Sequence, residues 1–248
     1  MKTRRRKSKK GKAGSFYFFL FLFILLVIFG LNRLLFSENE ALIKQEIIDN
    51  KPIGFSSFGI DVSHHQGKID WQNLMVDFGF DSIIQFVYLK ATEGSDFTDN
   101  QYDYNKSELK KLGVKCGAYH FYLPNEFPEA QAQHFLKTIQ YFPGDLPPVI
   151  DVEILPKDRS RFLINLHRFA SIIESELAVK PVIYTSRSIF ETQFTKDFLS
   201  YSFWVASYYK TIEHIEDARI IHWQYSDKGK LPGISGHLDF NVSKIKYY

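Results

Sequence analysis

The sequence predicts an α/β protein: a modified TIM-like barrel of the (β/α)5(β)3 type, preceded by an N-terminal transmembrane helix. Two observations lead to this prediction. A run of sixteen residues without a charged side chain occupies positions 16–31. Further along, eight short apolar or β-branched runs follow one another. Helix-like segments separate the earlier runs, and weaker helical patterns separate the last three.

The chain begins with a basic tail, which we assign to residues 1–15. The 248 residues include 31 Lys or Arg and 28 Asp or Glu, a formal net charge of +3. Eight of the basic residues lie in the first twelve positions, so the remaining chain has 31 − 8 = 23 bases against 28 acids, a formal charge of −5. A nucleic-acid-binding protein needs its basic residues on a folded face, so we expect no nucleic-acid partner.

Residues 16–36 are predicted to form a signal anchor that crosses the cytoplasmic membrane once. About 20 residues, at a rise of 1.5 Å each, span the roughly 30 Å hydrocarbon core. The basic tail keeps the N-terminus in the cytoplasm and places the rest of the chain on the periplasmic or cell-wall side. A cleaved signal peptide, which would make the protein secreted, is the alternative. The residues that follow, NRLLFSENEALIK, lack the small-residue pattern of a cleavage site.

Residues 37–57 are polar and acidic and include Pro52 and Gly54, so we expect a linker with at most one helical stretch. The folded domain then occupies residues 58–248. Its predicted strands are 58–62, 83–90, 114–121, 147–152, 181–185, 203–207, 219–225 and 237–242. Its predicted helices are 70–78, 99–112, 128–142, 159–178 and 188–199. A doubly wound open sheet is the competing architecture, but the chain lacks the glycine-rich nucleotide motifs typical of that fold.

Four acidic residues interrupt apolar strands: Asp61, Asp151, Glu153 and Asp239. A carboxylate inside an apolar strand is costly unless it is paired or functional. Residues 151 and 153 face the same side of a strand, with Cα atoms about 6.5–7 Å apart. Glycoside hydrolysis needs two carboxyl groups at this range, and crowding of like charges keeps one of them protonated as a general acid. The active site of a parallel barrel lies at such strand ends.

Several other residues have both a functional and a structural interpretation. Aromatic residues near the predicted strand ends could stack on sugar rings or simply fill the core. His64 and His65 would face opposite ways on an extended segment and have no partner motif, so we predict no metal or other cofactor. Cys116 is the single cysteine, which excludes a disulfide within the chain, and we expect it to be a buried, inert thiol.

A set of ordered motifs resembles glycoside hydrolase family 25. These motifs are GIDVSHHQG at 59–67, YLKATEG at 88–94, GAYHF at 117–121, PPVIDVE at 147–153, IYT at 183–185, WVA at 204–206, WQY at 223–225 and LDFN at 238–241. The resemblance implies an N-acetylmuramidase, or lysozyme, which cleaves the β-1,4 bond from N-acetylmuramic acid to N-acetylglucosamine in peptidoglycan. His65 departs from the pattern, since an aromatic residue is common at that position.

The resemblance also implies roles for particular residues. Glu153 matches the proton donor, and Asp61, Asp151 and Asp239 match the other acidic residues of the groove. Retention is expected, with either Asp151 or the 2-acetamido group of the substrate as nucleophile. We expect substrate contacts from Glu93, Tyr119, Tyr184, Trp204, Gln224 and Tyr225, and a monomer whose partners are peptidoglycan strands and the membrane. A catalytically inactive wall-binding protein is the alternative, but all four carboxylates are present.

Overall fold

The computed structural model describes residues 11–208 and 217–247. The chain divides into two compact units, residues 1–47 and 48–248, and each is described by itself. Helix α1 (Gly11–Asn50) contains the whole predicted span and continues through most of the predicted linker. From Phe16 onward the helix is long and apolar enough to cross a membrane, by length and composition alone. Most of the basic tail, residues 1–10, lies outside the described residues.

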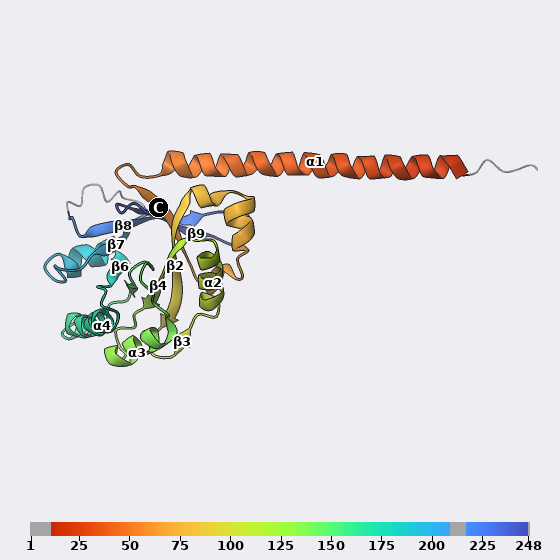
Figure 1. Cartoon of the computed structure of the whole chain (residues 1–248). Coiled ribbons are helices and arrows are strands. Elements are labelled where there is room, and N and C mark those ends of the chain that lie inside the picture. The colour runs from red at the N-terminus through yellow and green to blue at the C-terminus, as the bar shows by residue number, and fades with distance from the viewer. Residues whose placement is uncertain (1–10, 209–216, 248) are drawn as a thin grey trace, which may run out of the picture. The chain divides into compact units, whose positions relative to one another are not determined.

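The described part of the second unit contains one sheet, in which eight strands close into a barrel (Figure 1). The barrel strands are β1 (Ser57–Val62), β2 (Ile84–Glu93), β4 (Lys115–Phe121), β5 (Val149–Val152), β6 (Val182–Ser186), β7 (Phe203–Ala206), β8 (Ile220–Gly229) and β9 (Leu238–Ser243). Neighbouring strands from β1 to β8 are parallel, whereas β9 pairs antiparallel with both β8 and β1. A short strand, β3 (Phe97–Thr98), forms a hairpin with β2.

Helical segments follow each of the first five barrel strands. In chain order they are η2 (Asn73–Asp77), α2 (Tyr102–Lys111), α3 (Pro128–Thr138), α4 (Phe162–Leu177), and α5 (Arg187–Ile189) continued by η4 (Phe190–Phe194). The predicted (β/α)5(β)3 barrel is therefore confirmed. The helices predicted at 70–78 and 188–199 are shorter than expected and include the π-helical turns η2 and η4. Helix α4 buries residues spaced three or four apart, as an amphipathic helix does: Phe162, Leu166, Phe169, Ala170 and Ile173.

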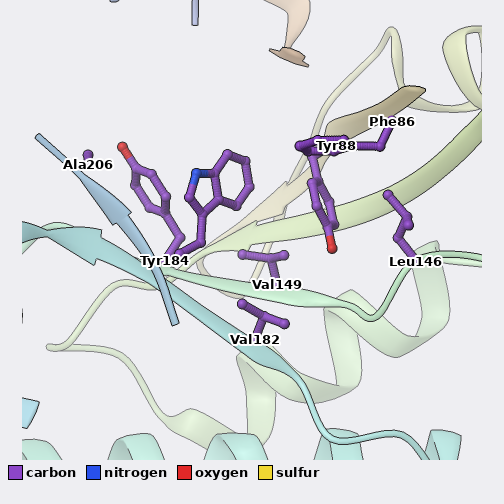
Figure 2. Packing of buried hydrophobic residues seen from close by; sticks show 8 residues of the cluster. Phe86, Tyr88, Leu146, Val149, Val182, Tyr184 and Ala206 are labelled. Atoms are coloured by element: carbon purple, nitrogen blue, oxygen red, sulfur yellow. The ribbon is translucent and has the colours of Figure 1, made fainter. Parts of the chain in front are cut away.

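The barrel interior is filled by large aromatic side chains from several strands. Figure 2 shows part of this cluster, in which Tyr88 of β2 and Tyr184 of β6 each pack against Trp204 of β7, with ring centres 5.0 Å apart. Gly117 on β4 makes room for Tyr88, because a Cβ atom at position 117 would lie 2.5 Å from the Tyr88 ring. Cys116 is buried and unpaired, as expected, and burial raises the pKa of its thiol to about 11.

Candidate active site

A cavity of about 80 Å³ opens among the C-terminal ends of the parallel strands. It brings together all four predicted acidic residues and four of the six predicted substrate contacts. The lining residues are Asp61, Tyr119, Val149, Asp151, Glu153, Tyr184, Trp204, Gln224 and Asp239. These residues come from seven strands and the residue just after β5, so only the closed barrel assembles the cavity.

Strand register explains why the acidic residues meet. Asp61 on β1 lies directly opposite Asp239 on the antiparallel strand β9. On the parallel side of the barrel, Asp151 of β5 is in register with Tyr184 of β6, which is in register with Trp204 of β7. Because alternate residues of a strand face the same side, Glu153 lies on the same side of its chain segment as Asp151.

A hydrogen-bond network holds Asp61 in a fixed position. Gln224 Nε2 and Asn241 Nδ2 both donate to Asp61 Oδ2, over 3.0 and 2.6 Å. Tyr184 donates its hydroxyl to Gln224 Oε1 over 2.7 Å, and Trp204 Nε1 donates to Asn241 Oδ1 over 3.0 Å. Each amide thus accepts from an aromatic side chain and donates to the carboxylate, which fixes the orientation of both amides.

Asp61 and Asp239 form a pair of facing carboxyl groups that influence each other's ionisation. Burial, and then the negative charge of Asp239, raise the pKa of Asp61 well above its ordinary value, while the two amides oppose that rise. Burial also raises the pKa of Asp239, to about 6. The pair therefore keeps a proton at pH values where ordinary carboxyl groups have lost theirs.

Asp151 and Glu153 share the cavity but differ in environment. Asp151 is buried at 7% exposure, and its Oδ1 has no hydrogen-bond partner among the described residues. Burial, followed by the charge of Glu153, raises the pKa of Asp151 well above its ordinary value. Glu153 is exposed to solvent. Partial burial raises its pKa, whereas the nearby hydroxyl of Tyr184 and the positive charge of Lys90 lower it. The cavity thus presents one deep and one accessible carboxyl group.

Lys90 belongs to this site, although the sequence analysis did not single it out. Its side chain is 10% exposed, and its ammonium group lies 2.6 Å from Glu93 Oε2 and 5.1 Å from the centre of the Phe121 ring. Phe121 is in register with Asp151, so the ammonium group lies beside a residue that neighbours the cavity, although Lys90 does not line the cavity itself. Its charge lowers the pKa of both Asp151 and Glu153. The sequence feature that could have identified Lys90 is its place within the otherwise apolar run YLKA.

Two predicted substrate contacts do not line this cavity. Glu93 forms the ion pair with Lys90 at the end of β2. Tyr225 packs against Trp223 and Phe240, with ring centres 6.2 and 6.3 Å apart. Tyr225 stands at a bulge of β8 and lies with these two rings, whereas its neighbour Gln224 lines the cavity. Contacts of Glu93 and Tyr225 with substrate stay predictions.

His64 and His65 do not lie on an extended segment, so that expectation was wrong. They begin the 3-10 turn η1 (His64–Gln66), which Ser63 and Gln66 cap reciprocally, and their rings lie 4.2 Å apart. His64 Nδ1 lies 2.8 Å from Oδ2 of the buried Asp99. Within the described residues, no three His, Cys, Asp or Glu side chains are grouped so as to hold a metal ion.

The family model described as "Glycosyl hydrolases family 25" matches residues 60–234. The chain belongs to glycosyl hydrolase family 25. It is 36% identical over 194 residues to the uncharacterised protein YegX of Escherichia coli O157:H7, covering 77% of this chain and 71% of that protein. It is 32% identical to the autolytic lysozyme of Clostridium acetobutylicum, covering 74% of this chain and 54% of that protein.

Solved structures of the family agree with the fold. A family 25 glycosyl hydrolase from Bacillus anthracis matches with a TM-score of 0.71 and 27% identity, over 78% of this chain and 91% of that chain. The bacterial lysozyme from Streptomyces coelicolor matches with a TM-score of 0.65 and 28% identity, over 77% of this chain and 93% of that chain. The protein is therefore a glycoside hydrolase, and the cavity lies where an active site of this kind of barrel is found.

Proposed function

We propose that the protein is a membrane-tethered N-acetylmuramidase. It hydrolyses the β-1,4 bond between N-acetylmuramic acid and N-acetylglucosamine in peptidoglycan, with retention of configuration. The observation that carries the proposal is the pairing of a buried carboxyl group, Asp151, with an accessible one, Glu153, in one cavity. Two carboxyl groups in unlike environments are what acid-assisted glycoside cleavage requires. Relatives named "Autolytic lysozyme" and "Lysozyme M1" support the choice of substrate.

Glu153 is the general acid and base of the proposed reaction. Its raised pKa keeps the carboxyl group protonated nearer to neutrality, and its exposure lets it reach a glycosidic oxygen. Glu153 gives its proton to the leaving oxygen of N-acetylglucosamine as the bond from C1 of muramic acid breaks. In the second half of the reaction, the Glu153 carboxylate takes a proton from the water that attacks C1.

In its ionised form, Asp151 acts on the opposite side of the reacting carbon in one of two ways. It attacks C1 and forms a covalent glycosyl-enzyme, or it accepts the N–H of the 2-acetamido group, whose oxygen then attacks C1. The unpaired Oδ1 supports a direct contact with substrate in both cases. Glycan from which the N-acetyl groups have been removed separates the two routes. Attack by Asp151 would survive their removal, whereas attack by the acetamide would not.

The other lining residues hold the sugar and balance its charge. Asp61 and Asp239 stabilise the positive charge that develops on the ring in an oxocarbenium-like transition state. Tyr119, Tyr184, Trp204 and Gln224 contact the sugar in the cavity, and Glu93 and Tyr225 contact substrate beyond it.

We further propose that residues 1–15 are cytoplasmic and that residues 16–36 cross the membrane once. Residues 37–57 then link the anchor to the hydrolase domain, residues 58–248, outside the cytoplasm. The excess of basic residues before the apolar stretch and its length support this topology. The protein acts as a monomer at the membrane, or as a secreted enzyme if the anchor is cleaved. Extraction of cell membranes with alkaline carbonate tests the anchor, since a spanning helix stays in the pellet.

The full chain, solubilised in detergent, should release reducing ends from purified peptidoglycan. Glu153→Gln should lower kcat by at least roughly a hundredfold, the lower range for loss of a general acid. Glu176→Gln is the matched control, because Glu176 is exposed on helix α4. Unchanged turnover in Glu153→Gln would exclude Glu153 as the acid. Binding of glycan by the parent protein without any release of reducing ends would contradict the proposed activity and favour the inactive wall-binding alternative.

A further inference from the structure

A second, larger hollow adjoins the catalytic cavity. This groove has a volume of about 560 Å³, and Glu153 and Tyr184 line both the cavity and the groove. Its remaining walls come from the end of β6, from the helical segment α5–η4 and from the end of β7. A volume of several hundred Å³ is typical of sites for small organic ligands. The groove therefore has room for a part of the substrate that the cavity cannot hold.

One residue of the groove is hydrogen-bonded to the network that holds Asp61. Tyr208 lines the groove, and its hydroxyl donates to Gln224 Oε1 over 2.6 Å. The same oxygen accepts from Tyr184, and the amide of Gln224 donates to Asp61. Both hydroxyl groups thus bind the amide that orients Asp61, so one hydrogen-bond network links the groove and the cavity.

An ion pair lies on the wall formed by α5–η4. Arg187 Nε donates to Glu191 Oε1 over 2.7 Å, and the two side chains are 27% and 47% exposed. They stand one helical turn apart, at positions i and i+4. The turn is fixed at its start by Ser186, whose hydroxyl accepts from the backbone N–H of Ile189. A ligand in the groove would therefore meet both a cation and an anion, which a capped helical turn presents.

We infer that this groove binds the peptide stem of a muramic acid residue on the leaving-group side of the cleaved bond. The inference rests on the proposed muramidase activity. Glu153 protonates the leaving oxygen, so the chain that departs must pass Glu153, and the groove begins there. N-acetylglucosamine is neutral, whereas the stem of the next muramic acid carries free carboxylates and, in many walls, an amino group. Arg187 pairs with a stem carboxylate, and Glu191 pairs with a stem ammonium group.

The test measures the activity of the full-length protein, in detergent micelles, on two soluble substrates. One substrate is uncross-linked glycan with its stems, and the other is the same glycan after an amidase has removed them. The measured quantity is the ratio of kcat/KM on stem-bearing glycan to kcat/KM on stripped glycan. Arg187→Met and Glu191→Gln should each lower this ratio about tenfold, because each removes one charge-assisted contact with the stem. Arg168→Met is the control, because it breaks an exposed pair of 2.9 Å with Glu129 on the outer helices.

A double exchange, Arg187→Glu with Glu191→Arg, separates recognition from helix stability. It keeps an ion pair at i and i+4 but reverses the charges that the ligand meets, so the ratio should still fall. An unchanged ratio in the single variants would overturn the inference, as would a double variant that behaves like the parent. An equal loss on both substrates would make the groove a site for the glycan chain instead. If the parent protein cleaves neither substrate, the proposed activity itself fails, which is a separate result.

Discussion

Replacing Asp239 by Asn should stabilise the barrel while it damages the proposed catalytic site. Burial raises the pKa of Asp239 to about 6 in the folded protein, against an ordinary value of 3.8. The folded state therefore holds this proton more tightly than the unfolded state does. The associated stability is fully present below pH 3.8, declines as the pH rises, and is lost above about pH 6. A difference of about 2 pH units, at 1.36 kcal/mol each, corresponds to about 3 kcal/mol.

Asn has nearly the same shape as Asp and no charge, so Asp239→Asn should raise the free energy of unfolding near neutral pH by up to about 3 kcal/mol. The replacement should also lower the pKa of Asp61, because it removes the negative charge that raises this pKa. This change adds to the gain in stability. In acid, where Asp239 is already protonated in both states, the two proteins should be equally stable. Urea unfolding followed by tryptophan fluorescence measures this, since all three tryptophans (Trp71, Trp204 and Trp223) belong to the barrel unit.

The matched control is Asp81→Asn, at an exposed position on η3 (Phe80–Ser82), which should leave stability unchanged at both pH values. An Asp239→Asn protein that is less stable than the parent at neutral pH would refute the reasoning. So would a gain of the same size in acid, because the stabilisation would then not come from the ionisation of Asp239.

Three further predictions concern single side chains. Lys90→Met should raise the pKa of both Asp151 and Glu153, because it removes the positive charge that lowers them, so the whole pH–rate profile should move to higher pH. Lys90→Arg keeps the charge and should leave the profile in place; a profile that Lys90→Met does not move would exclude this role. Gln224→Ala should cost about 1–3 kcal/mol of stability, because it strands buried polar partners, and a urea midpoint equal to that of the parent would contradict the network. Cys116 should resist thiol reagents in the folded protein, since burial raises its pKa to about 11, and modification as fast as in urea would argue against burial.

The eight barrel strands were predictable because each is a short apolar run that a single pattern identifies, whereas the short strand β3 was not predicted. The run at 181–185, for example, corresponds to β6 at Val182–Ser186. Helix ends were less predictable where side chains compete with the backbone. In the segment predicted as a helix at 188–199, the hydroxyl of Thr192 donates to the carbonyl oxygen of Ser188, and Phe198 adopts a positive φ of 53°. Neither this side-chain hydrogen bond nor the positive φ can be predicted from the local pattern of apolar and polar residues.

The residues of the candidate site were likewise predictable only in part. The four acidic residues could be found because a charge inside an apolar strand is conspicuous in the sequence. Lys90 was missed because it stood at the predicted end of a strand, where a lysine normally reaches solvent, whereas β2 continues to Glu93. The orientation of Gln224 depends on partners far away in the chain, 40 residues back at Tyr184 and 163 residues back at Asp61. Such contacts exist only in the folded barrel.

The antiparallel closing strand β9 affects when activity can begin. Asn241, which donates to Asp61, lies 180 residues after it in the chain, and β9 is the last strand of the barrel. During synthesis, β1 emerges long before its partner, so the carboxyl pair of Asp61 and Asp239 cannot form until β9 has also left the ribosome. A chain that stops before β9 would lack the strand that closes the barrel between β8 and β1, and it would lack Asp239. Synthesis of β9 is thus a built-in condition for assembly of the candidate site.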